Sequence, residues 1–268
     1  MTTSITRHRA SAEHHALAES ITINHKSAMQ LGTLFAIAAA LLLCSASAFA
    51  QYETDHFKCY LPLATSPIPT QPVQLVDQFG ASQAKIGSIW RFCNPTEKDR
   101  NGVITPITNP DAHLALQLEK TKGVVAREVT FENQFGQQSV ITGKAKYLGV
   151  PTQKDPHGPP FNLDHFNCYA VTAGKALGET VGLTDQWFAS KHKLGAPVLF
   201  CNPVQKTHNG VVTQIIHPKD HLVCYKAKPV AIDKAVQLHN QFGDPKFESK
   251  QADMLCVPTT KLEWHVIQ

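Results

Sequence analysis

Residues 55–60 read DHFKCY, and a near copy, DHFNCY, stands at residues 164–169. A second motif, FCNP, occurs at residues 92–95 and again at residues 200–203. The two motifs keep nearly the same spacing in both copies, so the chain contains a duplicated segment. This self-similarity decides the fold, because each copy must form the same structural unit.

Each copy is itself double. Residues 236–243 (VQLHNQFG) repeat residues 73–80 (VQLVDQFG), and residues 221–225 (HLVCY) repeat the cysteine motif once more. The chain therefore contains four related units that recur with a period of about 54 residues. Their similar parts are residues 55–99, 112–153, 164–206 and 220–261. Every unit has an early histidine, a central glutamine and a late lysine. These are His56, His113, His165 and His221; Gln78, Gln134, Gln186 and Gln241; and Lys98, Lys154, Lys206 and Lys261.

The units have the pattern of β-strands. Residues 73–79 alternate apolar and polar side chains, which is typical of a half-buried strand. The pairs Asn101-Gly102 and Asn209-Gly210 favour tight hairpin turns. Helical periodicity is scarce, and its best candidate, residues 170–183, contains three glycines. We predict an all-β protein of two similar disulfide-stapled domains, each a β-barrel or a β-sandwich and each an internal duplication of the unit.

The predicted domain limits follow from the repeat. Residues 51–153 form the first β domain, residues 154–163 a linker rich in proline and glycine, and residues 164–268 the second β domain. Residues 1–50 form a leader, in which an apolar run at residues 31–43 precedes small residues before Ala50. This pattern is typical of a secretory signal peptide. Either Met1 or Met29 is the true start.

Composition excludes several classes of protein. The chain has 268 residues, of which 43% are hydrophobic and 17% are charged, and its formal net charge is +4 at pH 7. The apolar fraction excludes wholesale disorder, and the charge is too small and mixed for a nucleic-acid surface. The sequence contains no P-loop, nucleophile elbow, HExxH motif or dinucleotide fingerprint. Catalysis therefore has little support, and we identify no cofactor.

The repeat predicts how the cysteines pair. Cys44 lies in the leader, which leaves six cysteines in an exported chain, where disulfides are favoured over metal thiolates. Three units have two cysteines each, whereas the second unit has Leu116 and Gly149 at the equivalent positions. Because the loss of one cysteine would leave its partner with an unpaired thiol, the two cysteines of a bridge should be lost together. The predicted disulfides are Cys59–Cys93, Cys168–Cys201 and Cys224–Cys256.

Several repeated or unusual side chains are candidates for binding. Lys98, Lys206 and Lys261 either guard strand edges or form a basic stripe for an anionic partner. In the third unit, Trp187 and Phe188 replace the usual aromatic-glycine ending. They form either an exposed recognition patch or a repacked part of the core.

The repeated histidines raise a metal hypothesis, because imidazole is a good zinc or copper ligand. The candidate ligands are His165, His217 and His221. Pro218 argues against a helix that would place His217 and His221 on one face. We interpret these histidines as structural, hydrogen-bonded to a carboxylate or to a backbone carbonyl.

The succession DHFxCY, DQF, FCNP, HLVCY, NQFG and LCVP resembles a family of exported bacterial domains, domain of unknown function 7450. The resemblance is best over residues 164–261, and it extends over residues 55–154 with both cysteines of the second unit missing. It implies export and tandem domains, and it supplies neither an activity nor site residues.

We therefore expect an exported, non-catalytic binding or structural module, secreted or periplasmic. The alternative is a metal-binding protein or metal-dependent enzyme that uses the repeated histidines. The candidate partner is a cell-surface or extracellular polymer or protein. We expect no nucleic-acid partner and no transmembrane segment after signal cleavage.

Overall fold

The computed structural model describes residues 52–63 and 68–268, and it contains strands, turns and irregular segments within these ranges. The predicted all-β class is confirmed. The expected leader, with Cys44, lies outside the described residues. In the described part of the chain, no helix is long and apolar enough to cross a membrane.

The described residues form fifteen strands. Those of the first two units are β1 (Phe57–Leu63), β2 (Gln71–Asp77), β3 (Gly80–Pro95), β4 (Glu97–Arg100), β5 (Val103–Thr105), β6 (His113–Thr121), β7 (Arg127–Asn133) and β8 (Gly136–Lys154). Those of the last two units are β9 (Phe166–Ala173), β10 (Thr180–Thr184), β11 (Ala189–Pro203), β12 (Gln205–His208), β13 (Val211–Thr213), β14 (His221–His239) and β15 (Lys246–Val266).

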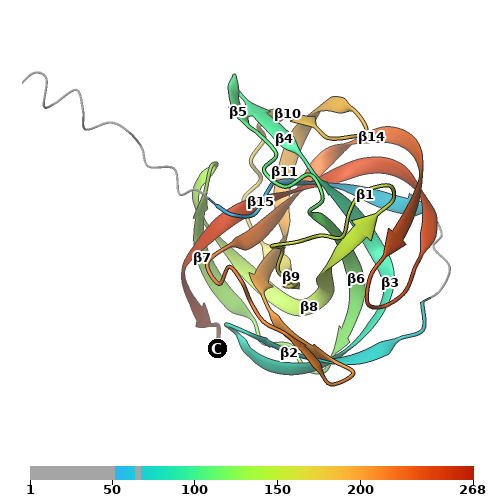
Figure 1. Ribbon diagram of the computed structural model, residues 1–268. Coiled ribbons are helices and arrows are strands. Elements are labelled where there is room, and N and C mark those ends of the chain that lie inside the picture. Colours follow the sequence, from blue (N-terminus) through green and yellow to red (C-terminus); the bar gives the residue numbers. More distant parts are fainter. Residues whose placement is uncertain (1–51, 64–67) are drawn as a thin grey trace, which may run out of the picture. The chain divides into compact units, whose positions relative to one another are not determined.

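Eight of these strands form a closed ring, which can be followed in Figure 1. Each pairs with two antiparallel neighbours in the order β1–β3–β6–β8–β9–β11–β14–β15, and β15 pairs in turn with β1. Of the two expected architectures, such closure belongs to a barrel, because a sandwich keeps two separate sheets.

Three disulfide bonds join neighbouring strands of the ring. They link Cys59 to Cys93, Cys168 to Cys201 and Cys224 to Cys256, which confirms the predicted pairing. In each bond the two cysteines face each other in the strand register, with Cα atoms 3.9–4.0 Å apart. All six lie in one buried apolar cluster. The bridges therefore fill the interior of the ring at one height, here called the disulfide level.

Leu116 and Gly149 occupy the fourth equivalent position. They face each other between β6 and β8, and Leu116 belongs to the same buried cluster as the cysteines. A Cβ atom on Gly149 would lie 3.5 Å from Leu116 Cδ2 and 3.2 Å from the Cβ atom of Phe166. The leucine therefore fills the space that the glycine leaves open, and the interior stays packed without a bridge.

Four hairpins extend from the ring, and each packs on a distant unit. Each late lysine ends a Pro-x-x-Lys segment, and these segments are residues 95–98, 151–154, 203–206 and 258–261. The hairpin strands β2, β10, β7 and β14 pair with the strands that carry these lysines, which are β12, β4, β15 and β8, respectively. In every case the partner segment belongs to the unit two places along the chain. Each unit therefore completes its sheet only with the help of another unit.

The two sequence halves lie in one compact unit, Ala50–Gln268. The first strand, β1, pairs with the last, β15. The carboxylate of Asp220 also accepts hydrogen bonds from the backbone nitrogens of Glu53 (2.9 Å) and Thr54 (3.1 Å). The boundaries between residues 153 and 164 therefore mark the duplication in the sequence, and the described halves do not form separate bodies.

Two local predictions have opposite outcomes. The Asn-Gly turns are confirmed: Asn101 and Gly102 join β4 to β5 with φ angles of 54° and 83°, and Asn209 and Gly210 join β12 to β13 with 49° and 80°. Positive φ at both positions is the mark of a type I′ hairpin. The helix candidate at residues 170–183 is wrong, because residues 170–173 belong to β9, residues 174–179 are irregular and residues 180–183 belong to β10. Its three glycines weaken a helix.

Replacing Leu116 and Gly149 together with cysteine is expected to create a fourth disulfide. The two positions face each other as the natural pairs do, so little backbone movement is needed. In the chain-entropy model the bridge stabilises by up to about 3–4 kcal/mol, less the lost packing of Leu116. Alkylation and mass spectrometry should find no free thiol in the double variant and one in the Leu116→Cys control. Two reactive thiols in the double variant would contradict the shared register.

Candidate functional site

The repeated histidines and glutamines meet between successive units. The amide nitrogen of Gln134 donates to Nε2 of His56 at 2.6 Å, and that of Gln241 donates to Nε2 of His165 at 2.7 Å. A ring nitrogen that accepts a hydrogen bond carries no proton, so both imidazoles are neutral. Burial, together with a nearby lysine, lowers the pKa of each of these histidines to about 3.

The repeated lysines complete the same contacts. Lys98 donates to the side-chain oxygen of Gln134, and Lys206 donates to that of Gln241 at 2.5 Å. Both lysines are 2% exposed, and burial lowers their pKa to about 8. They form neither an edge guard nor an exposed basic stripe, because their strands pair on both sides and their ammonium groups are bonded internally.

The other two units carry an altered form of this arrangement. Lys154 and Lys261 donate to asparagine oxygens instead, at 3.5 and 3.1 Å. His221 Nε2 lies 3.4 Å from the side-chain oxygen of Gln78. Within the described ranges, neither ring nitrogen of His113 has a hydrogen-bond partner. The set of contacts among histidine, glutamine and lysine is thus complete for the histidines of the first and third units and incomplete for those of the second and fourth.

The three predicted metal ligands are not brought together as a ligand set. His165 is held by Gln241, His221 Nδ1 lies 2.9 Å from a backbone oxygen, and His217 Nε2 lies 3.0 Å from Asn162. Among residues 52–63 and 68–268, no group of three or more His, Cys, Asp or Glu side chains is arranged to hold a metal ion. The contacts observed are those of structural histidines.

Trp187 and Phe188 are half-buried and pack against the ring. The ring of Trp187 meets Tyr60 edge-on, with centroids 4.5 Å apart, and Phe92 lies 5.8 Å away. The ammonium group of Lys58 lies 3.6 Å from the centroid of Phe188 and donates to its carbonyl oxygen at 3.0 Å. These contacts favour a repacked core over an exposed recognition patch.

Sequence reasoning missed the role of the aspartates that begin the units. Asp55 accepts hydrogen bonds from the backbone nitrogens of Thr108 and Asn109, both at 2.8 Å. Asp164 does the same for residues 216 and 217, at 2.6 and 2.7 Å. Each carboxylate thus fixes the segment that leads into the next unit. Their recurrence was visible in the sequence, but their backbone partners were not.

One serine–histidine pair has partial catalytic geometry. Ser190 Oγ lies 2.8 Å from His192 Nε2, and His192 Nδ1 lies 3.0 Å from the carbonyl oxygen of Lys228. A nucleophilic serine also needs oxyanion donors and a substrate cleft. Neither surface hollow described for this molecule is lined by these residues. The pair therefore orders two adjacent strands.

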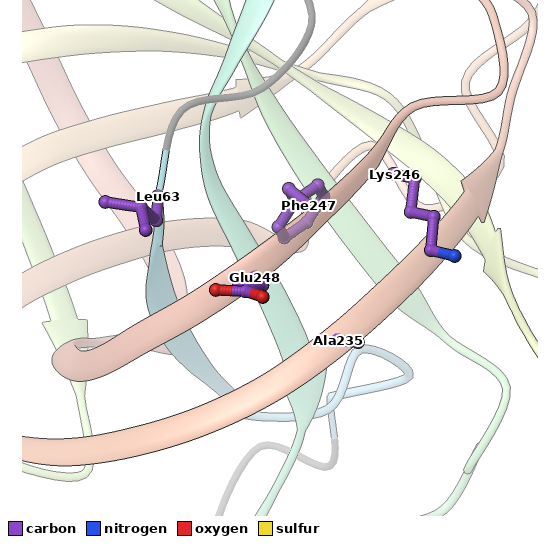
Figure 2. Close-up of a pocket in the computed structure, with 5 residues that line it drawn as sticks. All are labelled: Leu63, Ala235, Lys246, Phe247 and Glu248. Carbon is purple, nitrogen blue, oxygen red and sulfur yellow. The ribbon is translucent and has the colours of Figure 1, made fainter.

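A shallow hollow of about 320 Å³ opens at the end of β14 and β15. Figure 2 shows its lining residues, which are Leu63, Ala235, Lys246, Phe247 and Glu248. The only carboxylate, that of Glu248, is already paired with Lys250 at 2.8 Å. The hollow thus has an apolar side and few free polar groups. Such a lining does not suit a catalytic site.

These features define a disulfide-cross-linked, all-β repeat protein whose conspicuous polar residues bind one another. The chain belongs to the family described as "Repeat of unknown function (DUF7450)", whose model matches residues 116–258. The resemblance seen in the sequence is thereby confirmed. No curated protein and no solved structure matches the chain.

Replacing Gln134 with alanine is expected to destabilise the protein by about 1–2 kcal/mol, because it removes the partner of the buried His56 and Lys98. Denaturant unfolding at pH 7 measures the change. Gln83→Ala is the matched control, since Gln83 is exposed on β3, and it should change the stability little. Equal effects of the two substitutions would contradict a bridging role for Gln134.

Replacing His165 with glutamine is expected to flatten the loss of stability in acid. The folded-state pKa of His165 is about 3 rather than 6.5, so between these values the unfolded state binds a proton that the folded state does not. The native protein therefore loses up to roughly 1.4 kcal/mol per pH unit from this group as the pH falls.

Unfolding curves at pH 7, 5 and 4 measure this difference. The control is His265→Gln, because the side chain of His265 is 65% exposed. Native protein and His165→Gln should diverge in their pH dependence, and parallel profiles would show that His165 is not held neutral.

Proposed function

We propose that the protein acts outside the cytoplasm, secreted or periplasmic, as a non-catalytic module that binds or supports another molecule. The observation that carries this proposal is the set of three buried disulfides inside the ring. Disulfides persist in oxidising compartments and are rare in the cytosol. The apolar run before Ala50, which has the pattern of a signal peptide, agrees with this location.

The non-catalytic part of the proposal is supported by the use of the repeated polar residues. A general acid or base must reach a substrate proton, whereas His56, His165, Lys98 and Lys206 are buried and bonded within the chain. A buried network whose members satisfy one another rigidifies a fold and specifies one packing. A rigid, cross-linked scaffold suits a module that presents its surface to a partner.

The protein expressed from Met1 in a bacterial host is expected in the exported fraction, with Gln51 at its N-terminus and no reactive thiol. Fractionation, N-terminal mass spectrometry and alkylation test this. Unfolding without reductant should expose no thiol, and unfolding after reduction should expose six. A cytosolic protein that keeps its leader and has seven reactive thiols when unfolded without reductant would contradict the proposal.

A further inference from the structure

A narrow groove is formed by residues of β3, of β6 and of the segment that precedes β2, and its volume is about 140 Å³. It is lined by Ile68, Thr70, Lys85, Gly87, Ser88, Leu118 and Lys120. Drug-sized ligands need about 300–1,000 Å³, and one water molecule takes up about 30 Å³. The groove therefore has room for one small chemical group with its hydration, and not for a whole cofactor.

Two lysines face each other across this groove. Lys85 and Lys120 are direct partners in the antiparallel register of β3 and β6, a position where side chains start about 5 Å apart. Both are exposed, and neither forms an ion pair with a carboxylate in the part of the chain that the structure describes. Like charges in such a pair are destabilising, unless an anion lies between them.

The rest of the lining suits an oxyanion. Ser88 Oγ accepts a hydrogen bond from the backbone nitrogen of Ile68 at 3.4 Å, which leaves its hydroxyl hydrogen free to donate. Gly87 is not among the residues with positive φ, so the backbone does not require glycine there. A Cβ atom on Gly87 would lie 3.5 Å from Thr70 Cγ2. Its absence leaves space open beside Thr70 in the lining of the groove.

The position of the groove in the ring adds to its positive potential. Lys120 follows the disulfide level along β6, and Lys85 precedes it along the antiparallel β3, so both lie at the same end of the ring. The ring strands carry other exposed lysines on this side, namely Lys146, Lys193, Lys226 and Lys228. Asp233 and Glu248 stand on the same stretches of β14 and β15, where both are paired with Lys250. The lysines named above therefore leave an excess of positive charge on these strand segments.

We propose that this groove binds a phosphate group borne by a larger anionic molecule outside the cytoplasm. The two ammonium groups hold its oxygens from opposite sides, and the Ser88 hydroxyl donates a third hydrogen bond. The flanking lysines attract the rest of the molecule. This inference rests on the proposed function, and it names the ligand chemistry of that module.

NMR titration of the oxidised protein with inorganic phosphate tests the site, with chloride added to keep the ionic strength constant. Saturable shifts are expected for residues that line the groove. Lys85→Gln with Lys120→Gln should weaken the affinity about tenfold or more, because two charged donors are lost. The control is Lys175→Gln with Lys219→Gln, which removes the same charge from exposed positions outside the strands and should change the affinity less than about twofold.

A second arm identifies the source of the phosphate. Inorganic polyphosphate should bind more tightly than phosphate and compete with it, whereas phosphatidylglycerol vesicles should not bind more tightly than phosphate does. Absence of saturable phosphate binding, equal weakening in both double variants, or binding to vesicles alone would overturn the proposal. If phosphate fails to bind while the protein is exported with all six thiols protected, the groove assignment fails and the proposed module stands.

Discussion

The pairing of residues directly opposite each other at the disulfide level is the constraint on which the rest of the structure depends. Three of the four pairs are cystines and the fourth is Leu116 with Gly149. The sulfur of Cys59 lies 3.7 Å from that of Cys256 in the adjacent bridge. A slip of one residue would turn each cysteine out of the interior. The covalent pairs thus fix the register of the ring, and through it the places where the four hairpins leave.

The outer shell depends on that ring because its contacts cross between units. A hairpin pairs with the unit two places along, and the turn glutamine bonds the histidine of the preceding unit. An isolated unit would lack the glutamine that bonds its histidine and lysine, and it would also lack the strand that covers the lysine. The ring is therefore the smallest assembly in which the repeated polar residues are satisfied. This accounts for the contacts between the two sequence halves, which the duplication alone would describe as separate domains.

The sequence predicted those features that are local to one unit. The disulfides follow from the joint loss of cysteines in the second unit, and the turns follow from Asn101-Gly102 and Asn209-Gly210. The partner of each glutamine could not be predicted, because four similar units offer four similar histidines. Burial of Lys98 and Lys206 was missed for the same reason. A Pro-x-x-Lys segment looks like an exposed edge until a strand from another unit covers it.

Departures from the repeat are concentrated in the second unit. They lie on β6, which contributes Leu118 and Lys120 to the groove that we propose as a phosphate site. β6 has Leu116 in place of a cysteine and Gln117 where the other units have tyrosine. It also carries His113, whose ring nitrogens have no hydrogen-bond partner in the described part of the chain. Both polar atoms of the Gln117 side chain also lack partners among the described residues. In a duplicated protein, positions common to all units serve the shared fold. Positions that differ in one unit alone are therefore not required by the shared fold. Lys120 stands on this strand but is not itself such a departure, because Lys228 occupies the equivalent position of the fourth unit. The opposed pair of Lys85 and Lys120 adds nothing to the stability of the ring. A binding role therefore accounts for that pair better than a role in the fold.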